Sequence, residues 1–438
     1  MTLSSVAPTR SGRPLRPPGL YVEDVAAAAP EAPALMSGVP AFIGFAHPKQ
    51  VLPRAVSSIQ GVVIERWDAR EFDAAIAPAP QSFLRMAVRG FFANGGKRCV
   101  VLMVPPPAAG ADGSAGRDGL LRALQRGGPL EDRTDFDLIC IPDAVLLRDD
   151  GARHEVYAAA LAHCKRMGDR FAILDAPHIG SSEAQAPVET MLHLSSSLRS
   201  EYGAMYFPWI AVDPARDGLA SAPPRAGSEE WRCLPRAAQR HEPGANGFMP
   251  PCGHVAGLFA RIDALVGPQR APANEMLEGV VDTSIRLTAV QHAMLNEGGV
   301  NCLRSLRGRG IEVGGARTLS GHSLWAYVST ARVILGFRRW LAVGMRDFVF
   351  EPQTTMLWDS MRIRLVSHCL ELQRAGALAG SDSAQAFFVK CDGKTNTTDE
   401  RDLGRVVAHV GLAPSVPAEF IVVRVVHDAS GFTFSGLS

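Results

Sequence analysis

Glycines and a basic pair in the first quarter of the chain resemble a phosphate-binding loop. Gly90 and the run Gly95-Gly96-Lys97-Arg98 come close to that motif, but the spacing is one residue off and Arg98 replaces the required Ser or Thr. A helical pattern precedes the glycines and a strand pattern follows them. A phosphate site needs the reverse order, because the N–H groups at the start of a helix bind the phosphate. We therefore predict a helix end here.

Two further groups could hold a ligand, and each has a structural alternative that we favour. Cys252-Gly253-His254 offers two metal-ligand types, but no second pair stands at a suitable spacing, and Pro250-Pro251 precede the motif. The start of a helix explains it better. Gly393-Lys394-Thr395 lacks the upstream glycine of a phosphate loop, since Phe388 stands there, and a polar turn is expected.

Aspartates that follow apolar segments could act as general bases. Asp73, Asp175 and Asp213 are of this kind, and they would suit a Rossmann-like α/β enzyme or a nucleotide-binding protein. However, no GxGxxG motif accompanies them, and no histidine joins a Ser or Cys in a nucleophile motif. Strand-end aspartates more often cap turns. We predict no catalytic residue, cofactor or metal site, and the enzyme remains the alternative.

Composition indicates a globular protein of more than one domain. The 438 residues are 47% hydrophobic and 20% charged, which suffices for a sizeable core in two or three domains. The net charge is +1, so no overall field favours nucleic acid or an anionic membrane. Most basic residues are Arg, which suits interfaces and carboxylate pairing, although genome composition would give the same bias.

The cysteines and the first residues of the chain indicate the cellular compartment in which the protein folds. None of the eight cysteines forms a CxxC, and most lie in apolar runs, as reduced buried thiols of a protein folded in the cytosol do. The first residues, MTLSSVAPTRSGRP, contain no apolar core of a signal peptide. No apolar run approaches the ~18 residues of a membrane-spanning helix, so no insertion in a membrane is expected.

Helix and strand patterns alternate through the first half of the chain. Residues 1–19 are rich in Pro, Arg and Ser and should form an extended arm. Strands are expected at 20–25, 39–45, 99–104, 136–141, 171–174 and 204–210, and helices at 81–94, 154–167 and 186–202. Gly-rich residues 108–130 and polar residues 213–250 are expected to be surface loops. This alternation predicts an α/β fold.

The second half is first helical and then rich in strands. Helices are expected at 254–265, 285–297, 323–346 and 354–375, and strands at 386–391, 406–412 and 420–426. The chain then ends in a Gly/Ser-rich tail. Together the two halves predict a mixed α/β and α+β protein.

Segments along nearly the whole chain resemble the contractile tail sheath family of phages, R-type bacteriocins and extracellular injection systems. Pro18-Gly19-Leu20-Tyr21-Val22-Glu23-Asp24-Val25 is similar to the family's opening PGVYVEEV. The most specific segment is Gly314-Gly315-Ala316-Arg317-Thr318-Leu319, where Gly314 replaces the family's usual Trp. The others, in order, are 38–44, 91–99, 169–175, 206–209, 251–257, 271–275, 295–301, 350–352, 376–380, 388–392 and 417–420.

The resemblance implies a two-domain sheath subunit with terminal arms. Residues 1–37 would form an N-terminal arm and strand, 38–298 an outer α/β domain, and 299–438 an inner domain ending in a strand-donating arm. The implied function is a structural sheath subunit, not an enzyme. The implied partners are further copies of the chain in stacked rings, an inner tube protein, baseplate and terminal cap proteins, and sheath paralogues. Assembly in the bacterial cytoplasm, into a phage tail or a released tail-like particle, is implied as well.

Two strands near the chain ends are candidates for exchange between subunits. Tyr21, Val22 and Val25 lie on the first, and Phe420, Val422 and Val425 lie on the second. Strands donated on flexible tethers would hold subunits together while these slide, because main-chain hydrogen bonds do not depend on side-chain arrangement. The alternative is that both strands belong to the chain's own sheet.

A basic helix is the candidate for contact with the inner tube. Arg332, Arg338, Arg339 and Arg346 lie on the helix expected at 323–346, which also carries apolar positions. Pairs of charges across a wet interface would orient a tube and still release it. The helix at 354–375, with Arg362, Arg364 and Arg374, is the second candidate. The alternative is an ordinary solvated surface helix.

Overall fold

A computed structural model describes twelve stretches of the chain. These are residues 37–46, 61–76, 78–79, 81–106, 114–179, 186–212, 247–306, 310–348, 351–380, 382–415, 421–428 and 431–437. All of them belong to one compact unit, Ala34–Ser438. The predicted N-terminal arm with Tyr21, Val22 and Val25 lies outside the described residues, and so do Asp213 and most of the predicted loop at 213–250.

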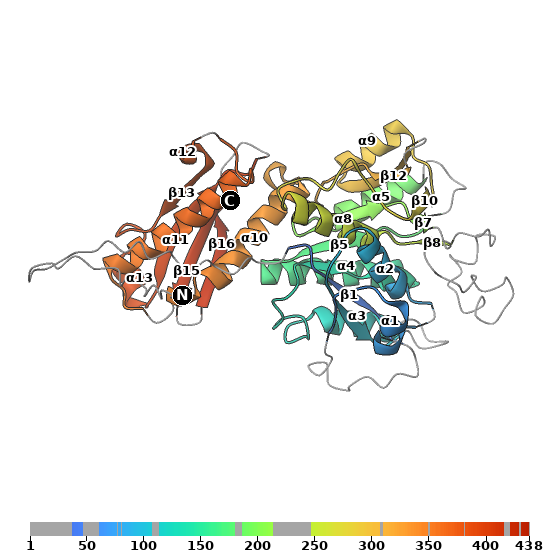
Figure 1. Ribbon diagram of the computed structural model, residues 1–438, viewed down its shortest axis with the longest axis horizontal. Helices are drawn as coiled ribbons and strands as arrows, with labels where there is room; N and C mark the ends of the chain where they lie inside the picture. The colour runs from blue at the N-terminus through green and yellow to red at the C-terminus, as the bar shows by residue number, and fades with distance from the viewer. Residues whose placement is uncertain are drawn as a thin grey trace, which may run out of the picture. The chain divides into compact units, whose positions relative to one another are not determined.

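The described strands form three sheets (Figure 1). A nine-stranded sheet has the order β2-β3-β1-β4-β5-β6-β11-β12-β9, a small sheet has the order β10-β7-β8, and a third has the order β13-β14-β15-β16. The strands are β1 Pro40–Phe45, β2 Val62–Ile64, β3 Cys99–Val104, β4 Leu138–Cys140, β5 Phe171–Asp175, β6 Gly203–Phe207, β7 Ile210–Val212, β8 Phe248–Met249, β9 Glu275–Met276, β10 Val280–Thr283, β11 Val300–Leu306, β12 Gly310–Val313, β13 Phe387–Lys390, β14 Val406–Leu412, β15 Ile421–Asp428 and β16 Gly431–Leu437.

Helices connect these strands, and most lie where their apolar spacing predicts. They are α1 Ala69–Ile76, α2 Leu84–Ala93, α3 Ser114–Leu124, α4 Asp150–Met167, α5 Ala186–Ser197, α8 Cys252–Leu265, α9 Ala289–Glu297, α10 Val328–Gly344, α11 Thr355–Arg374, α12 Ser383–Ala386 and α13 Thr398–Asp402. The predicted loop at 108–130 is wrong for α3. Leu120 and Leu124 are buried there, and the packing of this apolar face outweighs the low helix propensity of Gly116 and Gly119.

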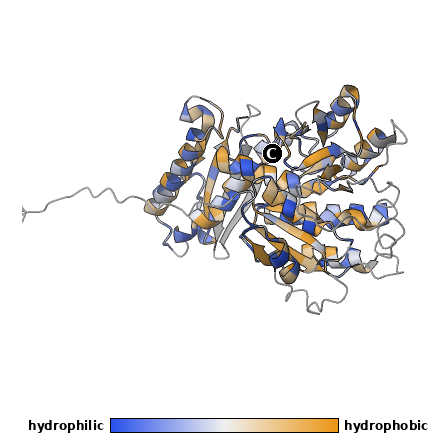
Figure 2. Cartoon of the chain, turned by 45° about the vertical axis from the view of Figure 1, so that its right-hand side comes forward, coloured by the Kyte–Doolittle hydropathy of each residue, from blue (hydrophilic) through white to orange (hydrophobic). Residues whose placement is uncertain are grey.

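The centre of the nine-stranded sheet is parallel and buried on both faces. β1 pairs in parallel with β3 and β4, and the parallel pairing continues through β5, β6 and β11. β1, β3 and β5 are buried at every residue, as the continuous apolar runs of these segments predict. In Figure 2 the strands of this sheet are mostly orange, the colour of hydrophobic residues. The predicted mixed α/β class is confirmed.

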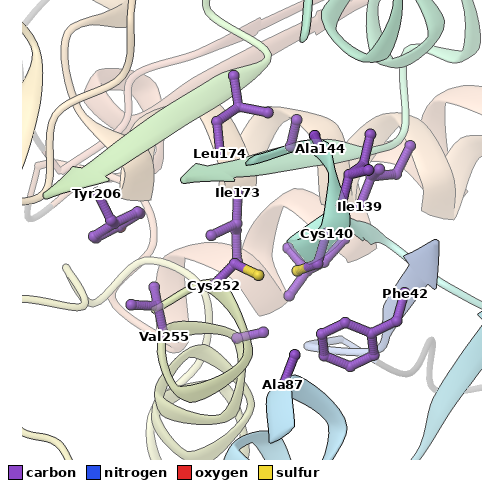
Figure 3. Packing of buried hydrophobic residues seen from close by; sticks show 14 of the residues in the cluster. Phe42, Ala87, Ile139, Cys140, Ala144, Ile173, Leu174, Tyr206, Cys252 and Val255 are labelled. Atoms are coloured by element: carbon purple, nitrogen blue, oxygen red, sulfur yellow. The ribbon is translucent and has the colours of Figure 1, made fainter. Parts of the chain in front are cut away.

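Two glycines allow α8 to pack closely against α2. A Cβ added at Gly253 would lie 2.1 Å from the carbonyl oxygen of Ala87, and one added at Gly257 would lie 2.3 Å from that of Phe91. Figure 3 shows Cys252 and Val255 of α8 beside Ala87 of α2, beneath the strands that carry Ile139 and Ile173. Only glycine permits this approach of two helix backbones.

Among the residues whose burial the structure describes, the main hydrophobic core ends within α10. The core cluster runs from Val39 to Leu335, whereas α11, β13 and β14 bury their own apolar residues, such as Leu365 and Val410, outside that cluster. The predicted boundary at 298/299 lies directly before β11 and stays a prediction. Gly299, with φ +84°, turns the chain into β11, and β11 pairs in parallel with β6 inside the nine-stranded sheet.

Candidate assembly surfaces

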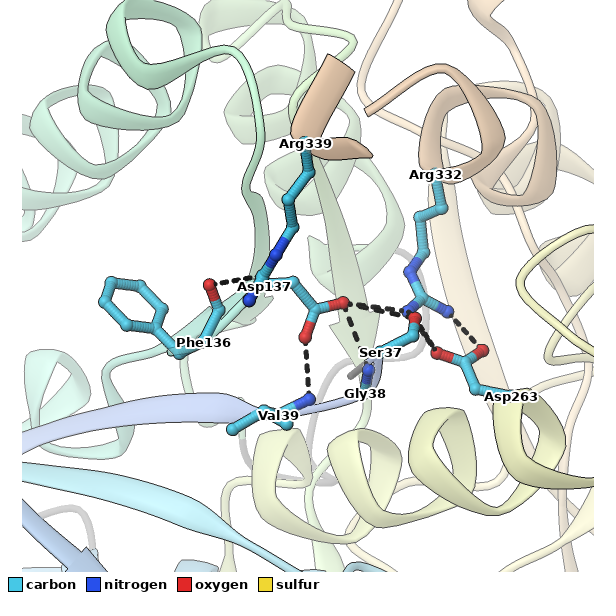
Figure 4. A network of polar contacts seen from close by, with 8 residues as sticks. All are labelled: Ser37, Gly38, Val39, Phe136, Asp137, Asp263, Arg332 and Arg339. Atoms are coloured by element: carbon cyan, nitrogen blue, oxygen red, sulfur yellow. Dashed lines mark hydrogen bonds and ion pairs between the residues drawn. The ribbon is translucent and has the colours of Figure 1, made fainter. Parts of the chain in front are cut away.

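The side chain of Arg332 lies inside the protein, between two carboxylates. Its Nη1 donates to Oδ1 of Asp263 at 2.8 Å, and its Nη2 lies 3.3 Å from Oδ2 of Asp137 (Figure 4). The guanidinium also lies 4.9 Å from the ring centre of Phe259. Burial alone would lower the pKa of Arg332, but the two carboxylates outweigh burial and raise this pKa above its usual value. Arg332 is therefore charged and fully committed within the chain.

The next two arginines of α10 also point into the protein. Arg339 donates to the carbonyl oxygens of Phe136 and Thr134, both at 2.6 Å, and Arg338 donates to the hydroxyl of Tyr202 at 3.2 Å. Arg338 is 8% exposed and Arg339 is 7% exposed. The structure thus contradicts the predicted basic surface for Arg332, Arg338 and Arg339. Arg346, beyond the end of α10, is the one of the four that is exposed.

Helical spacing contains the signal that separates these arginines from a solvated face. Arg332 and Arg339 follow Val328 by four and eleven residues, and Leu335 follows it by seven, so all four share one face of the helix. Arg338 likewise shares a helix face with Ile334, four residues before it, and with Leu341, three residues after it. An arginine at an apolar position of a helix is buried only when partners compensate its charge or its donors. Those partners, Asp137 and Asp263, are remote in sequence, and this is why the sequence did not reveal them.

The second strand predicted for exchange lies inside the chain's own sheet. Val422 and Val425 are on β15, which pairs with β14 on one side and with β16 on the other; Phe420 lies outside the described residues. β16 occupies the segment for which a Gly/Ser-rich tail was expected. The outer strands of this sheet are β13 and β16. In the single chain, β15 therefore belongs to the chain's own sheet, as the alternative to strand exchange predicts.

Next to this sheet, α11 presents a mixed outer face. Met356 is 78% exposed and Ile363 is 63% exposed, although both are large and apolar. Arg362 and Arg374 are exposed on the same helix, whereas Arg364 is half-buried and donates to the carbonyl oxygen of Gly344 at 2.8 Å. Exposed apolar and basic side chains together are typical of a surface that meets a protein partner.

A buried aspartate lies at the position where an α/β enzyme usually binds its ligand. At the switch in strand order between β1 and β4, Asp143 accepts hydrogen bonds from the Phe45 amide and the Ser82 hydroxyl at 2.6 Å, and from the Phe83 amide at 2.7 Å. Ligands of such sheets usually lie at this switch point. Burial raises the pKa of Asp143 to about 6, against the effect of these hydrogen bonds. Sequence reasoning missed this residue.

The aspartates predicted as possible bases have structural roles where the structure describes them. Asp175, 1% exposed, accepts the backbone N–H of Cys252 at 2.8 Å and so binds the start of α8. Burial raises the pKa of Asp175 to about 7. Asp73 is exposed and pairs with Arg85 at 2.8 Å.

The motifs with possible ligand chemistry also have structural roles. Gly95, with φ +103°, ends α2 ahead of β3, and the Gly96 amide bonds to the Phe91 carbonyl at 3.0 Å. Asp392 accepts the amides of Lys394 and Thr395 in a turn. His254 on α8 is 4% exposed, and burial lowers its pKa to about 4. Within the described part of the chain, no cluster of three or more His, Cys, Asp or Glu side chains could hold a metal.

One cavity of about 460 Å³ lies beside the carboxyl end of β5. Its walls come from α4, α5 and the residues after β5. They include Arg153, His154, His178 and His193. Arg153 pairs with Asp150 of the same helix.

Among the described helices, none combines the length and apolar character of a membrane span.

The chain shares sequence and fold with known sheath proteins. The model of the phage tail sheath protein central domain matches residues 130–319. A putative prophage major tail sheath protein of Pseudomonas aeruginosa (strain UCBPP-PA14) is 25% identical over 199 residues, which are 44% of this chain and 47% of that protein. The match thus spans about half the length of this relative.

Solved sheath structures match nearly the whole chain. A chain of the anti-feeding prophage helical sheath in the contracted state has a TM-score of 0.65 and 26% identity, covering 92% of this chain and 97% of its own. The chain is thus similar in sequence and fold to contractile tail sheath proteins. A chain from the PVC sheath complex of an extracellular contractile injection system, also contracted, has a TM-score of 0.66 and 23% identity, over 93% of this chain and 96% of its own.

A crystal structure of another sheath tail protein shows the same fold at low sequence identity. The sheath tail protein of Desulfitobacterium hafniense has a TM-score of 0.56 at 11% identity, over 93% of this chain and 99% of its own. These homologues are contractile sheath subunits, and this likeness supports a structural role over the enzyme alternative.

Proposed function

We propose that this chain is the structural subunit of a contractile sheath. Copies of it polymerise as stacked rings around an inner tube, and shortening of this polymer drives the tube through a target envelope. The observation that carries the proposal most is the likeness, over 92% of the chain, to a subunit of a helical sheath in the contracted state. New contacts between subunits drive the contraction, so the chain itself needs no nucleotide.

The proposed assembly route and partners follow from the family. The subunit assembles in the bacterial cytoplasm and becomes part of a phage tail or a released tail-like particle. It contacts the inner tube protein, the baseplate, the terminal cap and sheath paralogues. It binds no nucleic acid and does not insert into a membrane, in keeping with its net charge of +1.

Electron microscopy of the purified protein tests the sheath proposal. The subunit, expressed alone or with its tube protein, is expected to form tubes or striated rods in negative stain. An α/β enzyme would form monomers or small oligomers. Uniform small particles under all assembly conditions would overturn the proposal.

We also propose that strands of the C-terminal sheet are exchanged between neighbours once the sheath forms. β14 and β15 pair over seven residue positions, including His409 with Arg424, so a disulfide can mark this pairing. With the substitutions His409→Cys and Arg424→Cys, oxidised sheaths are expected to give a ladder of linked chains on a non-reducing gel, because the paired strands come from different subunits.

A control within the same sheet makes this crosslinking result interpretable. Lys390 pairs with His409 across β13 and β14, so the substitutions Lys390→Cys and His409→Cys should link only within one chain. Monomer-sized bands from the β14–β15 pair in assembled sheaths would contradict exchange and leave β15 in its own sheet.

For the inner tube we propose contact through the exposed arginines near the end of α10 and on α11. These are Arg346, Arg362 and Arg374. Reversal of Arg346 and Arg374 to Glu is expected to give empty or prematurely contracted sheaths. The subunit itself should lose less than ~0.5 kcal/mol of stability, because exposed charges contribute little to folding.

Electron micrographs of particles measure this effect as the fraction of sheaths that contain a tube. Arg286, 78% exposed on the α/β domain, provides a matched charge reversal that should leave the particles unchanged. Extended, tube-filled particles from the Arg346→Glu/Arg374→Glu variant would refute the tube contact.

A further inference from the structure

The chain enters β1 through three residues that are held unusually firmly. We call Ser37, Gly38 and Val39 the β1 root. The carboxylate of Asp137 accepts the amide of Gly38 at 3.1 Å and that of Val39 at 2.7 Å. In return, the carbonyl oxygen of Val39 accepts the amide of Asp137 at 2.9 Å. Asp137, the residue directly before β4, is thus bonded to the β1 root through both its side chain and its backbone.

A second set of contacts binds the β1 root to α8. The Ser37 hydroxyl donates to Oδ2 of Asp263 at 2.6 Å (Figure 4). Gly38 has a φ of +75°, and a Cβ added there would lie 2.6 Å from the Cα of Ala260. The backbone of the β1 root therefore lies directly against the α8 backbone. The φ of Gly38 is one that residues with a side chain rarely adopt.

Arg332 is the part of this arrangement that allows both carboxylates to be buried together. Its Nη2 donates to the Ser37 hydroxyl at 3.2 Å, and its side chain is 4% exposed. The side chains of Asp263 and Asp137 are 2% and 13% exposed. Two carboxylates at this depth would repel each other and lack compensation without the guanidinium. One side chain of α10 thereby connects the β1 root, β4 and α8.

We propose that Arg332 is a positioning residue for the N-terminal arm. It fixes the place and direction at which residues 1–36 enter the fold, so that a pull along these residues passes at once to the sheet, to α8 and to α10. The pull itself rests on the proposed sheath function and on the expectation that a neighbouring subunit holds the N-terminal strand with Tyr21, Val22 and Val25. A tether transmits motion only if its attachment does not slip, and the β1 root is the last point before the tether.

A neighbouring arginine separates this role from a general contribution to folding. Arg339 lies on the same helix and is 7% exposed, against 5% for Arg332. It donates to the carbonyl oxygens of Phe136 and Thr134 and has no hydrogen bond to the β1 root among the described contacts. Loss of either arginine removes buried hydrogen bonds, but only loss of Arg332 frees the β1 root.

Hydrogen exchange in the purified full-length subunit tests the positioning directly. In Arg332→Gln, the amides of Gly38 and Val39 are expected to exchange roughly tenfold faster or more, because Asp137 and Asp263 no longer keep their positions. In Arg339→Gln, these two amides should exchange within about twofold of the wild-type rate, while the amides around Phe136 change. Ser37→Ala, which removes only the hydroxyl of an exposed residue, should give an intermediate increase without loss of folding.

The same variants in assembled particles test the transmission of the pull. Arg332→Gln and Ser37→Ala sheaths are expected to assemble but to contract incompletely after triggering, while Arg339→Gln sheaths contract normally. If wild-type chains form no sheath, the proposed function fails and the exchange result stands by itself. If wild-type sheaths contract but Arg332→Gln and Arg339→Gln behave alike, or if Ser37→Ala changes neither readout, the positioning role is overturned.

Discussion

Deletion of residues 416–438 is expected to abolish sheath polymerisation completely while most of the subunit stays folded. The deletion removes β15 and β16, which are half of the four-stranded C-terminal sheet. Among the residues whose burial the structure describes, the main core runs from Val39 to Leu335, ahead of the deleted segment. Each lost main-chain hydrogen bond is worth ~0.5–1.5 kcal/mol, and the loss recurs at every contact of a repeating polymer.

Two measurements separate the expected effects of this truncation. Limited proteolysis should yield a protected fragment that contains the nine-stranded sheet, and negative stain should show no tubes. The shorter deletion of residues 431–438 removes β16 alone and should still permit β14 and β15 to pair, so it is expected to shorten tubes rather than to eliminate them. Tubes of normal length from the 416–438 deletion would show that the C-terminal strands are dispensable for assembly.

Gly253→Ala is expected to destabilise the α/β domain by ~3 kcal/mol or more, although alanine is the better helix former. The added Cβ would lie 2.1 Å from the Ala87 carbonyl oxygen and 2.5 Å from the Ala87 Cα. Both atoms are backbone, so no side chain can rotate away, and α2 and α8 have to separate. Urea unfolding monitored by circular dichroism measures this loss.

Gly336 on α10 provides the matched control for the same substitution. It is exposed, and nothing lies within 4 Å of a Cβ built there. Gly336→Ala should therefore stabilise the subunit by ~0.5–1 kcal/mol, the difference in helix propensity between the two residues. If Gly253→Ala also proved stabilising, the helices would not be packed as closely as the structure indicates.

The elements that the sequence predicts best are those with one clear period. Continuous apolar runs predict β1, β3 and β5, since strands buried on both faces need no alternation. The spacing of Leu84, Val88 and Phe91 predicts α2. At β14 the predicted and observed ranges, 406–412, coincide. In each case the local pattern and the tertiary environment agree.

The errors occur where distant packing decides the outcome. Gly116 and Gly119 indicate a loop, but the burial of Leu120 and Leu124 makes α3 a helix. The small residues after Asp428 indicate a tail, yet pairing with β15 makes β16 a strand. Register and pairing are properties of two segments, and a pattern within one segment does not contain them.

The dependence on distant segments also explains why the sequence misassigned the arginines of the candidate site. The sequence identified α10 as an arginine-rich helix, and the structure has it at Val328–Gly344. The role of each arginine depends on Asp137 and Asp263, which are 195 and 69 residues away from Arg332 in the chain. Reading Arg332 and Arg339 as part of the apolar face would have predicted burial, but not the partners that make burial possible.

The order of the sheets along the chain, with β15 and β16 after the nine-stranded sheet, has a consequence for the timing of synthesis. A ribosome makes the nine-stranded sheet first, and this sheet has its own core and can fold while translation continues. Until the last residues emerge, β14 lacks the strand that covers one of its edges. A nascent chain is thus a folded but incomplete building block. In the proposed sheath, joining the growing polymer is therefore expected to wait until β15 and β16 have been made, so a product truncated before them would not be built into the particle.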